Sequence, residues 1–325
     1  MKVLITGGAG FLGQRLARQL LQRGTIADAE SRQRKIDKLV LLDVVAATGF
    51  DDVRVEVVAG DISNADVVAR AIGSDTGSVF HLAAVVSGQA ERDFDLGMRV
   101  NLDASRLVLE ACRQAGNKPR VLFTSSVAVY GGELPAGVLD STQLNPQSSY
   151  GVQKAIGELL LSDYTRKGFI DGRVARLPTI SVRPGRPNAA ASSFASGIIR
   201  EPLNGEDAVC PVAGDTRLWL LSPRQAIESL VALHDVDPVA LGASRVVNLP
   251  GLSVSVTEMV AALRKVAGDV VADRVSWTRD PAIERIVGSW PGSWDTTRAT
   301  SLGLRADASF EAIVRSYIED ERTPA

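Results

Sequence analysis

The chain has 325 residues, of which 45% are hydrophobic and 23% charged, and its formal net charge at pH 7 is −2. This length allows one large α/β domain with a smaller appended unit. The near-neutral charge supplies no basic field for nucleic acid or an anionic membrane, and no apolar run approaches the ~20 residues of a membrane span. The N-terminal residues lack a signal-type pattern. We therefore expect a cytoplasmic protein with no nucleic-acid or membrane partner.

Potential metal ligands are scarce. The chain has two histidines and two cysteines, Cys112 and Cys210, which lie far apart in the sequence. Metal sites built on these residue types need clustered ligands, so we expect no bound metal. The two thiols are expected to be reduced and mostly buried.

The first thirteen residues have the pattern of a strand, a phosphate-binding turn and the start of a helix. An apolar run leads into glycines, and apolar residues then recur at helical spacing over 11–23. Gly7, Gly10 and Gly13 have G-x-x-G-x-x-G spacing, and the alternative G-x-G-x-x-G spacing starts at Gly8. Glycines allow a pyrophosphate to approach the backbone at a helix N-terminus, where N–H groups are unpaired. This stretch predicts dinucleotide binding.

Asp43 ends the next apolar run, 38–43, which is typical of a parallel strand buried on both faces. A carboxylate at this position accepts hydrogen bonds from ribose hydroxyls and repels a 2′-phosphate, which favours NAD over NADP. Asp43 follows Gly13 by 30 residues, whereas the fingerprint expects ~20. The polar residues 25–37, expected to form a solvated connection, account for the extra length.

Strand and helix patterns then alternate along the chain. Strands are expected at 54–58, 78–82, 120–123, 172–177 and 245–248, and helices at 64–72, 91–116, 148–167, 189–200, 255–268 and 308–320. This alternation predicts an α/β fold, a Rossmann-type doubly wound parallel sheet with a smaller C-terminal substrate domain. We place the NAD-binding domain at 1–180 and the substrate domain mainly at 181–325, with about 223–248 packing back on the first domain.

Tyr150 and Lys154 are the strongest candidates for chemistry. Their spacing of four residues puts both side chains on one face of a helix capped by Ser148 or Ser149. A phenol has a reference pKa near 10, and a nearby ammonium and the positive nicotinamide of an oxidised cofactor favour its anion. Tyr150 can then accept a proton from a secondary alcohol as hydride leaves its carbon. Ser126, at the end of the preceding strand, is placed to hydrogen-bond the same oxygen.

At these positions the chain resembles the extended short-chain dehydrogenase/reductases, which include nucleotide-sugar epimerases and dehydratases. The matching segments are Thr6–Gly13, Asp43, Gly60-Asp61, His81–Ala84, Asn101, Thr124–Gly131 and Tyr150-x-x-x-Lys154. The resemblance implies that Ser126, Tyr150 and Lys154 are catalytic, that Asp61 contacts adenine and that Asn101 stabilises the active-site helix. The expected cofactor-binding residues are Gly7, Gly10, Phe11, Leu12, Gly13, Asp43, Asp61, Ile62, Ala83, Ala84, Asn101, Tyr150, Lys154 and Pro178.

The second half of the chain departs from the epimerases. Where they commonly carry Arg-Asp-Tyr-Ile-His-Val, residues 217–222 read Arg-Leu-Trp-Leu-Leu-Ser, so only Arg217 agrees. Segments 84–90, 145–149, 183–193 and 285–294 resemble the D-erythronate dehydrogenase branch of the same family instead. That resemblance implies NAD-dependent oxidation of the C2 hydroxyl of a four-carbon sugar acid, D-erythronate, to 2-oxo-erythronate.

A carboxylate substrate needs a fixed cation, and arginine suits it. The candidates are Arg183 and Arg217, either of which can instead be an ion-pair partner at the surface or between domains. Hydroxyl contacts are expected from Ser87, Ser126 and Thr179. Trp290 and Trp294 are interpreted as core or subunit-contact aromatics.

Two other functions remain open from the sequence. One is a nucleotide-sugar epimerase or dehydratase, and the other is a non-catalytic NAD-sensing regulator, which has no need of the serine, tyrosine and lysine described above. The family resemblance also suggests a homodimer formed through the helices expected at 91–116 and 148–167.

Overall fold

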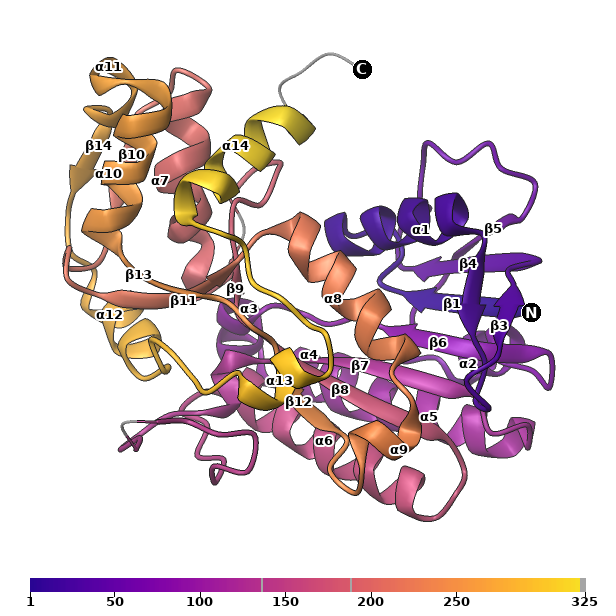
Figure 1. Cartoon of the computed structure of the whole chain (residues 1–325). Coiled ribbons are helices and arrows are strands. Elements are labelled where there is room, and N and C mark those ends of the chain that lie inside the picture. The colour runs from indigo at the N-terminus through magenta and orange to yellow at the C-terminus, as the bar shows by residue number, and fades with distance from the viewer. Residues whose placement is uncertain (136, 188, 322–325) are drawn as a thin grey trace.

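A seven-stranded parallel sheet forms the centre of the computed structural model, which describes residues 1–135, 137–187 and 189–321 (Figure 1). The strand order is β12-β8-β7-β6-β1-β4-β5. The strands are β1 (Lys2–Thr6), β4 (Lys38–Asp43), β5 (Val55–Ala59), β6 (Thr76–His81), β7 (Arg120–Ser126), β8 (Asp171–Leu177) and β12 (Val246–Asn248). The order reverses between β1 and β6, where doubly wound sheets bind their ligands. The predicted Rossmann-type fold is confirmed.

Helices cover both faces of this sheet. They are α1 (Phe11–Arg23) and α8 (Pro223–Asp235) on one face, and α2 (Ala65–Ala71), α5 (Ala104–Ala115) and α6 (Ser149–Arg166) on the other. Leu16 and Leu20 of α1 are fully buried in one core with Leu230 of α8, and Val108 of α5 and Leu161 of α6 lie in the other. Each helix therefore buries its apolar stripe against the sheet.

The C-terminal residues build a second core beside the carboxyl ends of the strands. Its helices are α7 (Phe194–Leu203), α10 (Val256–Ala267), α11 (Asp269–Ala272), α12 (Pro281–Gly288) and α14 (Phe310–Glu321). Its strands are β9 (Thr179–Ile180), β11 (Arg217–Leu221) and β13 (Leu252–Ser255) in one sheet, and β10 (Ala208–Cys210) and β14 (Val275–Trp277) in another. By contrast α9 (Pro238–Leu241), α13 (Thr297–Ser301) and β12 lie with the large sheet.

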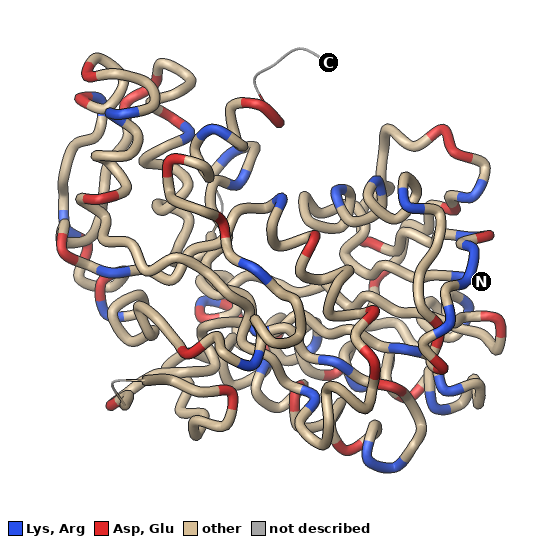
Figure 2. The backbone as a smooth tube through the Cα atoms, viewed as in Figure 1, with Lys and Arg blue, Asp and Glu red and all other residues tan. Residues whose placement is uncertain are grey.

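Charged residues of both signs are interspersed along both parts of the chain in the view of Figure 2. Cys112 and Cys210 are buried and carry free thiols, as expected.

The polar segment expected to be a solvated connection is instead a hairpin. Its strands are β2 (Thr25–Ala27) and β3 (Gln33–Lys35), which pair antiparallel. Ile26 and Ile36 anchor the hairpin in the core, and Asp235 of α8 accepts hydrogen bonds from Ala27 and Gln33. The hairpin was not predicted, because most of its residues are polar or charged and its large buried apolar side chains are only Ile26 and Ile36.

The helix expected at 91–116 begins earlier and is interrupted. It consists of α3 (Ser87–Arg92), α4 (Phe94–Gly97), a π-helical segment (Met98–Asp103) and α5. Asp93 separates α3 from α4, because its carboxylate accepts a hydrogen bond from Leu96 N at 3.0 Å and so caps α4. Similarly, the helix expected at 189–200 begins only at Phe194, after a 3₁₀ turn at Ala191–Ser193.

The turn between β1 and α1 requires its glycines. Gly7 has φ +72°, and a Cβ there would lie 2.9 Å from Ala83 N. A Cβ on Gly13 would lie 2.1 Å from Gly7 O and 2.9 Å from Gly8 Cα. These contacts involve backbone atoms, which cannot rotate away as a side chain can. Gly13 therefore allows α1 to pack directly against the turn.

We predict that Gly13→Ala destabilises the protein by about 1–3 kcal/mol or more, because the added methyl displaces the turn. The affinity for NAD should fall at least about tenfold, since the displaced turn is the predicted phosphate site. Urea unfolding and calorimetric NAD titration measure the two effects. Gly288→Ala is the matched control, because no atom lies within 4 Å of a Cβ at that position; equal effects in the two variants would contradict the assignment.

Candidate active site

Two cavities lie along the carboxyl ends of the strands, on either side of the glycine turn. The first has a volume of about 470 Å³. It is lined by seven of the expected cofactor residues, Gly7, Gly10, Asp43, Asp61, Ile62, Ala83 and Ala84. Gln89 of α3 and Arg99 of the π-helical segment also line it. These two residues were not predicted, because Gln89 precedes the helix expected at 91–116 and Arg99 lies in its π-helical interruption.

The N-terminus of α1 lies at the first cavity and has the features that a pyrophosphate needs. Gly10 is the N-cap of the helix and has no side chain to satisfy the N–H groups of the first turn. Gly7 and Gly13 allow the turn to pack tightly against the loop after β6 and against α1, and Gly7 and Gly10 line the first cavity. These residues fit a bound dinucleotide.

Two aspartates occupy the expected ends of β4 and β5. Asp43 accepts hydrogen bonds from Ala9 N at 3.0 Å and from Val44 N at 2.7 Å, so its carboxylate is held against the glycine turn. The backbone N–H and hydroxyl of Ser63 hold the pKa of Asp61 below its usual range, with a smaller contribution from Arg99. Both residues therefore present fixed carboxylates to the first cavity.

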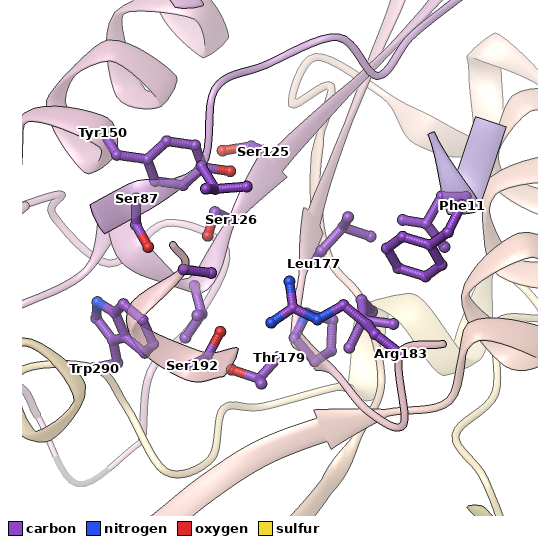
Figure 3. Close-up of a pocket in the computed structure, with 16 residues that line it drawn as sticks. Phe11, Ser87, Ser125, Ser126, Tyr150, Leu177, Thr179, Arg183, Ser192 and Trp290 are labelled. Atoms are coloured by element: carbon purple, nitrogen blue, oxygen red, sulfur yellow. The ribbon is translucent and has the colours of Figure 1, made fainter. Parts of the chain in front are cut away.

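The second cavity has a volume of about 160 Å³ and gathers side chains from both parts of the chain (Figure 3). It is lined by nine polar and aromatic residues, Phe11, Ser87, Ser125, Ser126, Tyr150, Thr179, Arg183, Ser192 and Trp290, and by Pro178. Leu12 also lines it. Tyr150, Ser126 and Ser87 lie on one side, and Thr179, Ser192 and Arg183 lie on the other.

Tyr150 is placed by the first turn of α6. Ser148 caps this helix by accepting from Gly151 N at 3.2 Å, and a Cβ on Gly151 would lie 2.1 Å from Ala128 O. The close approach brings the phenol beside Ser126. Burial raises the pKa of Tyr150 to about 12, while a hydrogen bond with Ser126 and the charge of Arg183 act to lower it. The phenol is therefore protonated at neutral pH in the ligand-free protein.

Lys154 lies one turn behind Tyr150 and is 2% exposed. Its Nζ donates to Thr124 O at 2.8 Å and lies 5.7 Å from the centroid of the Tyr150 ring. Burial lowers the pKa of Lys154 to about 7, and the nearby Glu158 carboxylate acts against this decrease. The expected basic group is thus present behind the phenol, and Arg183 is a second one near it that the sequence spacing did not reveal.

Three of the expected cofactor residues line neither cavity: Gly13, Lys154 and Asn101. Asn101, 1% exposed, accepts from Val85 N at 2.8 Å and donates to Gln153 Oε1 at 2.8 Å. It therefore joins the π-helical segment to the loop after β6 and to α6, rather than lining either cavity. Such π-helical insertions are frequent at functional sites.

Arg183 and Arg217 have different surroundings. Arg183 lines the second cavity, its guanidinium points inward in Figure 3, and its buried Nη2 has no hydrogen-bond partner among the described residues. Arg217 is exposed, donates to Ser253 O at 2.9 Å and pairs with Glu258 at 3.3 Å. The structure does not place Arg217 in the cavity.

The two tryptophans also differ. Trp294 is 5% exposed and donates to Leu249 O at 2.7 Å, as expected of a core aromatic. Trp290 packs against the same core but also forms a wall of the second cavity opposite Ser87, which was not expected. Trp290 and Ser192 lie in the segments 285–294 and 183–193 that carry the family resemblance, but nothing in the sequence marks these two side chains as cavity residues.

Within 1–135, 137–187 and 189–321, no group of three or more histidine, cysteine, aspartate or glutamate side chains is arranged to hold a metal ion. In the same residues, none of the helices is both long and apolar enough to cross a membrane.

Comparison with known proteins places this site in a family. Residues 3–221 match the NAD dependent epimerase/dehydratase family. The chain is 67% identical over 320 residues to a D-erythronate dehydrogenase of Cupriavidus necator, with 98% of each chain covered. It is 46% identical to a D-erythronate dehydrogenase of Haemophilus influenzae, with 98% of this chain and 99% of the relative covered.

A crystal structure described as the nucleoside-diphosphate-sugar epimerase from Agrobacterium tumefaciens is 42% identical, with a TM-score of 0.93. The alignment covers 99% of this chain and 94% of that one. The matched range, residues 3–221, includes the glycine turn, Asp43 and the Tyr150–Lys154 pair. The chain belongs to the NAD dependent epimerase/dehydratase family.

Proposed function

We propose that this protein oxidises the C2 hydroxyl of a four-carbon sugar acid, D-erythronate, to 2-oxo-erythronate with NAD. The observation that carries the proposal is Arg183, a guanidinium with an unpaired buried nitrogen, directed into a small cavity that also holds Tyr150 and Ser126. Arginine binds carboxylates through a planar pair of donors. The named activity of the two erythronate dehydrogenases supports the same substrate.

The reacting groups follow from this arrangement. With the substrate carboxylate on Arg183, the adjacent C2 hydroxyl lies toward Tyr150 and Ser126. Ser126 donates a hydrogen bond to the hydroxyl oxygen, and Tyr150 accepts its proton as the C2 hydride departs. NAD, when bound, supplies the hydride acceptor. Positive charge from Lys154 and Arg183 favours the phenolate that this step requires.

The size and lining of the cavity support a small polar substrate. A volume of about 160 Å³ suits a short sugar acid far better than a nucleotide sugar. Ser87 and Thr179 are the proposed partners of the substrate hydroxyls, and Ser192 adds a third hydroxyl. Trp290 closes the wall and limits the length of the carbon chain.

We also propose the organisation expected from the sequence, with residues 1–180 binding NAD and 181–325 mainly binding substrate. Contacts of α8 with α1 and β8, and of β12 with β8, support the assignment of 223–248 to the first unit.

A cytoplasmic homodimer through α5 and α6 is proposed as well. Val152 and Leu159 of α6, seven residues apart on one face, are 42% and 68% exposed, which supports this interface.

Formation of NADH on mixing purified protein, NAD and D-erythronate tests the proposed reaction. We predict net NADH from erythronate and neither net NADH nor isomerised product with nucleotide sugars, because the cavity of about 160 Å³ suits only the smaller substrate. An epimerase also gives no net NADH, since it returns the hydride to its own substrate. Tyr150→Phe should reduce turnover by at least about a thousandfold, since the variant has no group to accept the proton.

The Tyr150→Phe variant also controls for cofactor binding, which should remain within a few-fold of the wild-type affinity. Isomerised nucleotide sugar without net NADH would support the epimerase instead. NAD binding without turnover on either class of substrate would support the sensing regulator. Retained turnover in Tyr150→Phe would exclude the phenol as the base.

The carboxylate contact is tested by Arg183→Gln. We predict a 10- to 100-fold higher KM for erythronate, because a charge-assisted hydrogen bond contributes about 1.5–3 kcal/mol. The affinity for NAD, measured by calorimetry, should change little. Arg217→Gln is the matched control, because this arginine lies at the surface on Glu258 and should leave KM unchanged. Unchanged KM in Arg183→Gln, or a rise in Arg217→Gln alone, would overturn the assignment.

A further inference from the structure

Glu158 is a buried carboxylate directly behind the reacting groups. It lies one turn after Lys154 on α6 and is 2% exposed. The hydroxyl of Ser125 donates to Glu158 Oε1, and Ser125 immediately precedes Ser126 at the end of β7. A Cβ on Gly157 would lie 2.8 Å from the Phe123 ring, so α6 and β7 are in close contact here. The carboxylate therefore bridges the helix that carries Tyr150 and the strand that carries Ser126.

The same carboxylate holds the neighbouring strand. Arg176 donates to Glu158 from Nε at 2.9 Å and from Nη2 at 2.7 Å, a two-point contact between side chains that are both nearly fully buried. Arg176 lies near the end of β8, just before the cavity residues Pro178 and Thr179. Its Nη1 also donates to Tyr130 and to Asp140 O. The pair thus ties two adjacent strand ends to α6.

Glu158 is also the anion that faces Lys154. The groups around the Lys154 ammonium are Tyr150 and Glu158 on α6, Thr124 O and the Phe123 ring on β7, and His81 on β6. Burial, with a smaller effect of Lys154, lowers the pKa of His81 to about 3, so His81 is neutral at neutral pH. Among these groups only Glu158 supplies negative charge, and Arg183 adds a further cation on the far side of Tyr150.

We propose that Glu158 is a positioning residue for the oxidation: it fixes the strand ends that carry Ser126 and Thr179 and favours the cationic form of Lys154 behind Tyr150. The inference rests on the proposed function for its catalytic consequence. Its electrostatic part concerns the protein alone, so the two are separable by experiment.

Titration of Lys154 by NMR, in protein labelled with ¹³C at lysine Cε, tests the electrostatic part without substrate. Lys154→Arg assigns the signal. In Glu158→Gln the titration midpoint of Lys154 should fall by on the order of half a pH unit or more, because a nearby negative charge is lost while burial remains. Glu158→Asp, which keeps the charge, should restore most of the midpoint. An unchanged or higher midpoint in Glu158→Gln would overturn the proposal.

Two further variants separate this effect from simple damage to the fold. Asp171→Asn removes a buried carboxylate that pairs with Arg120 and Arg173 at the opposite end of the strands, and it should leave the Lys154 midpoint unchanged. A comparable shift in this variant would also overturn the proposal. Should Glu158→Gln not fold, Glu158→Gln with Arg176→Met removes both buried charges together. Its midpoint should still fall, though by less, because the lost Arg176 cation acts in the opposite direction and Glu158 is the charge that acts on Lys154 most strongly.

The catalytic consequence is measured in the same variants. In Glu158→Gln the rising limb of kcat against pH for erythronate oxidation should move to higher pH, because Tyr150 loses part of its cationic surroundings. A shifted Lys154 midpoint in a protein that oxidises no erythronate would contradict the proposed function and leave the electrostatic role intact. An unshifted midpoint with active wild-type enzyme would contradict only the role of Glu158.

Discussion

Close contact between α6 and the carboxyl end of β7 holds the reacting groups together. Gly151 and Gly157 leave room for backbone and ring atoms where a side chain would collide, and Ser148 caps the helix at the required point. The contact brings Tyr150 beside Ser126 and the Lys154 ammonium onto Thr124 O. Core packing is dense and transmits small displacements, so an extra methyl group in this contact would move every one of these groups.

The second constraint on the site is electrostatic, because burial changes the pKa values of both Tyr150 and Lys154. Burial raises the pKa of the Tyr150 phenol to about 12 and lowers that of the Lys154 ammonium to about 7, which are both unfavourable for a base that acts as phenolate. Surrounding charges act against each change, with Arg183 near the phenol and Glu158 near the ammonium. The site therefore depends on fixed charges from α6 and from the segment that follows β9, and desolvation strengthens their mutual effects.

The fold, the family and the cofactor could be predicted because their signals are local: a glycine turn between a strand and a helix, an aspartate at a strand end, and a four-residue spacing. The second cavity could be predicted only in part. Thr179 and Arg183 follow the sixth expected strand, and Ser192 lies further along the same stretch, in the 3₁₀ turn before α7. Trp290 comes from a distant segment, and the sequence does not show that Arg217 is exposed. Interruptions such as Asp93 and the π-helical segment depend on caps and tertiary contacts that periodicity does not encode.

The central claim is that the C2 carbon of a sugar acid is the hydride donor in the cavity formed by Tyr150, Ser126 and Arg183. The most direct measurement is mass spectrometry of the reduced cofactor after turnover of erythronate carrying deuterium at C2. The account predicts one deuterium per NADH formed, and a primary kinetic isotope effect on single-turnover hydride transfer. Unlabelled NADH from the C2-deuterated substrate, with label transfer from C3-deuterated substrate instead, would contradict it.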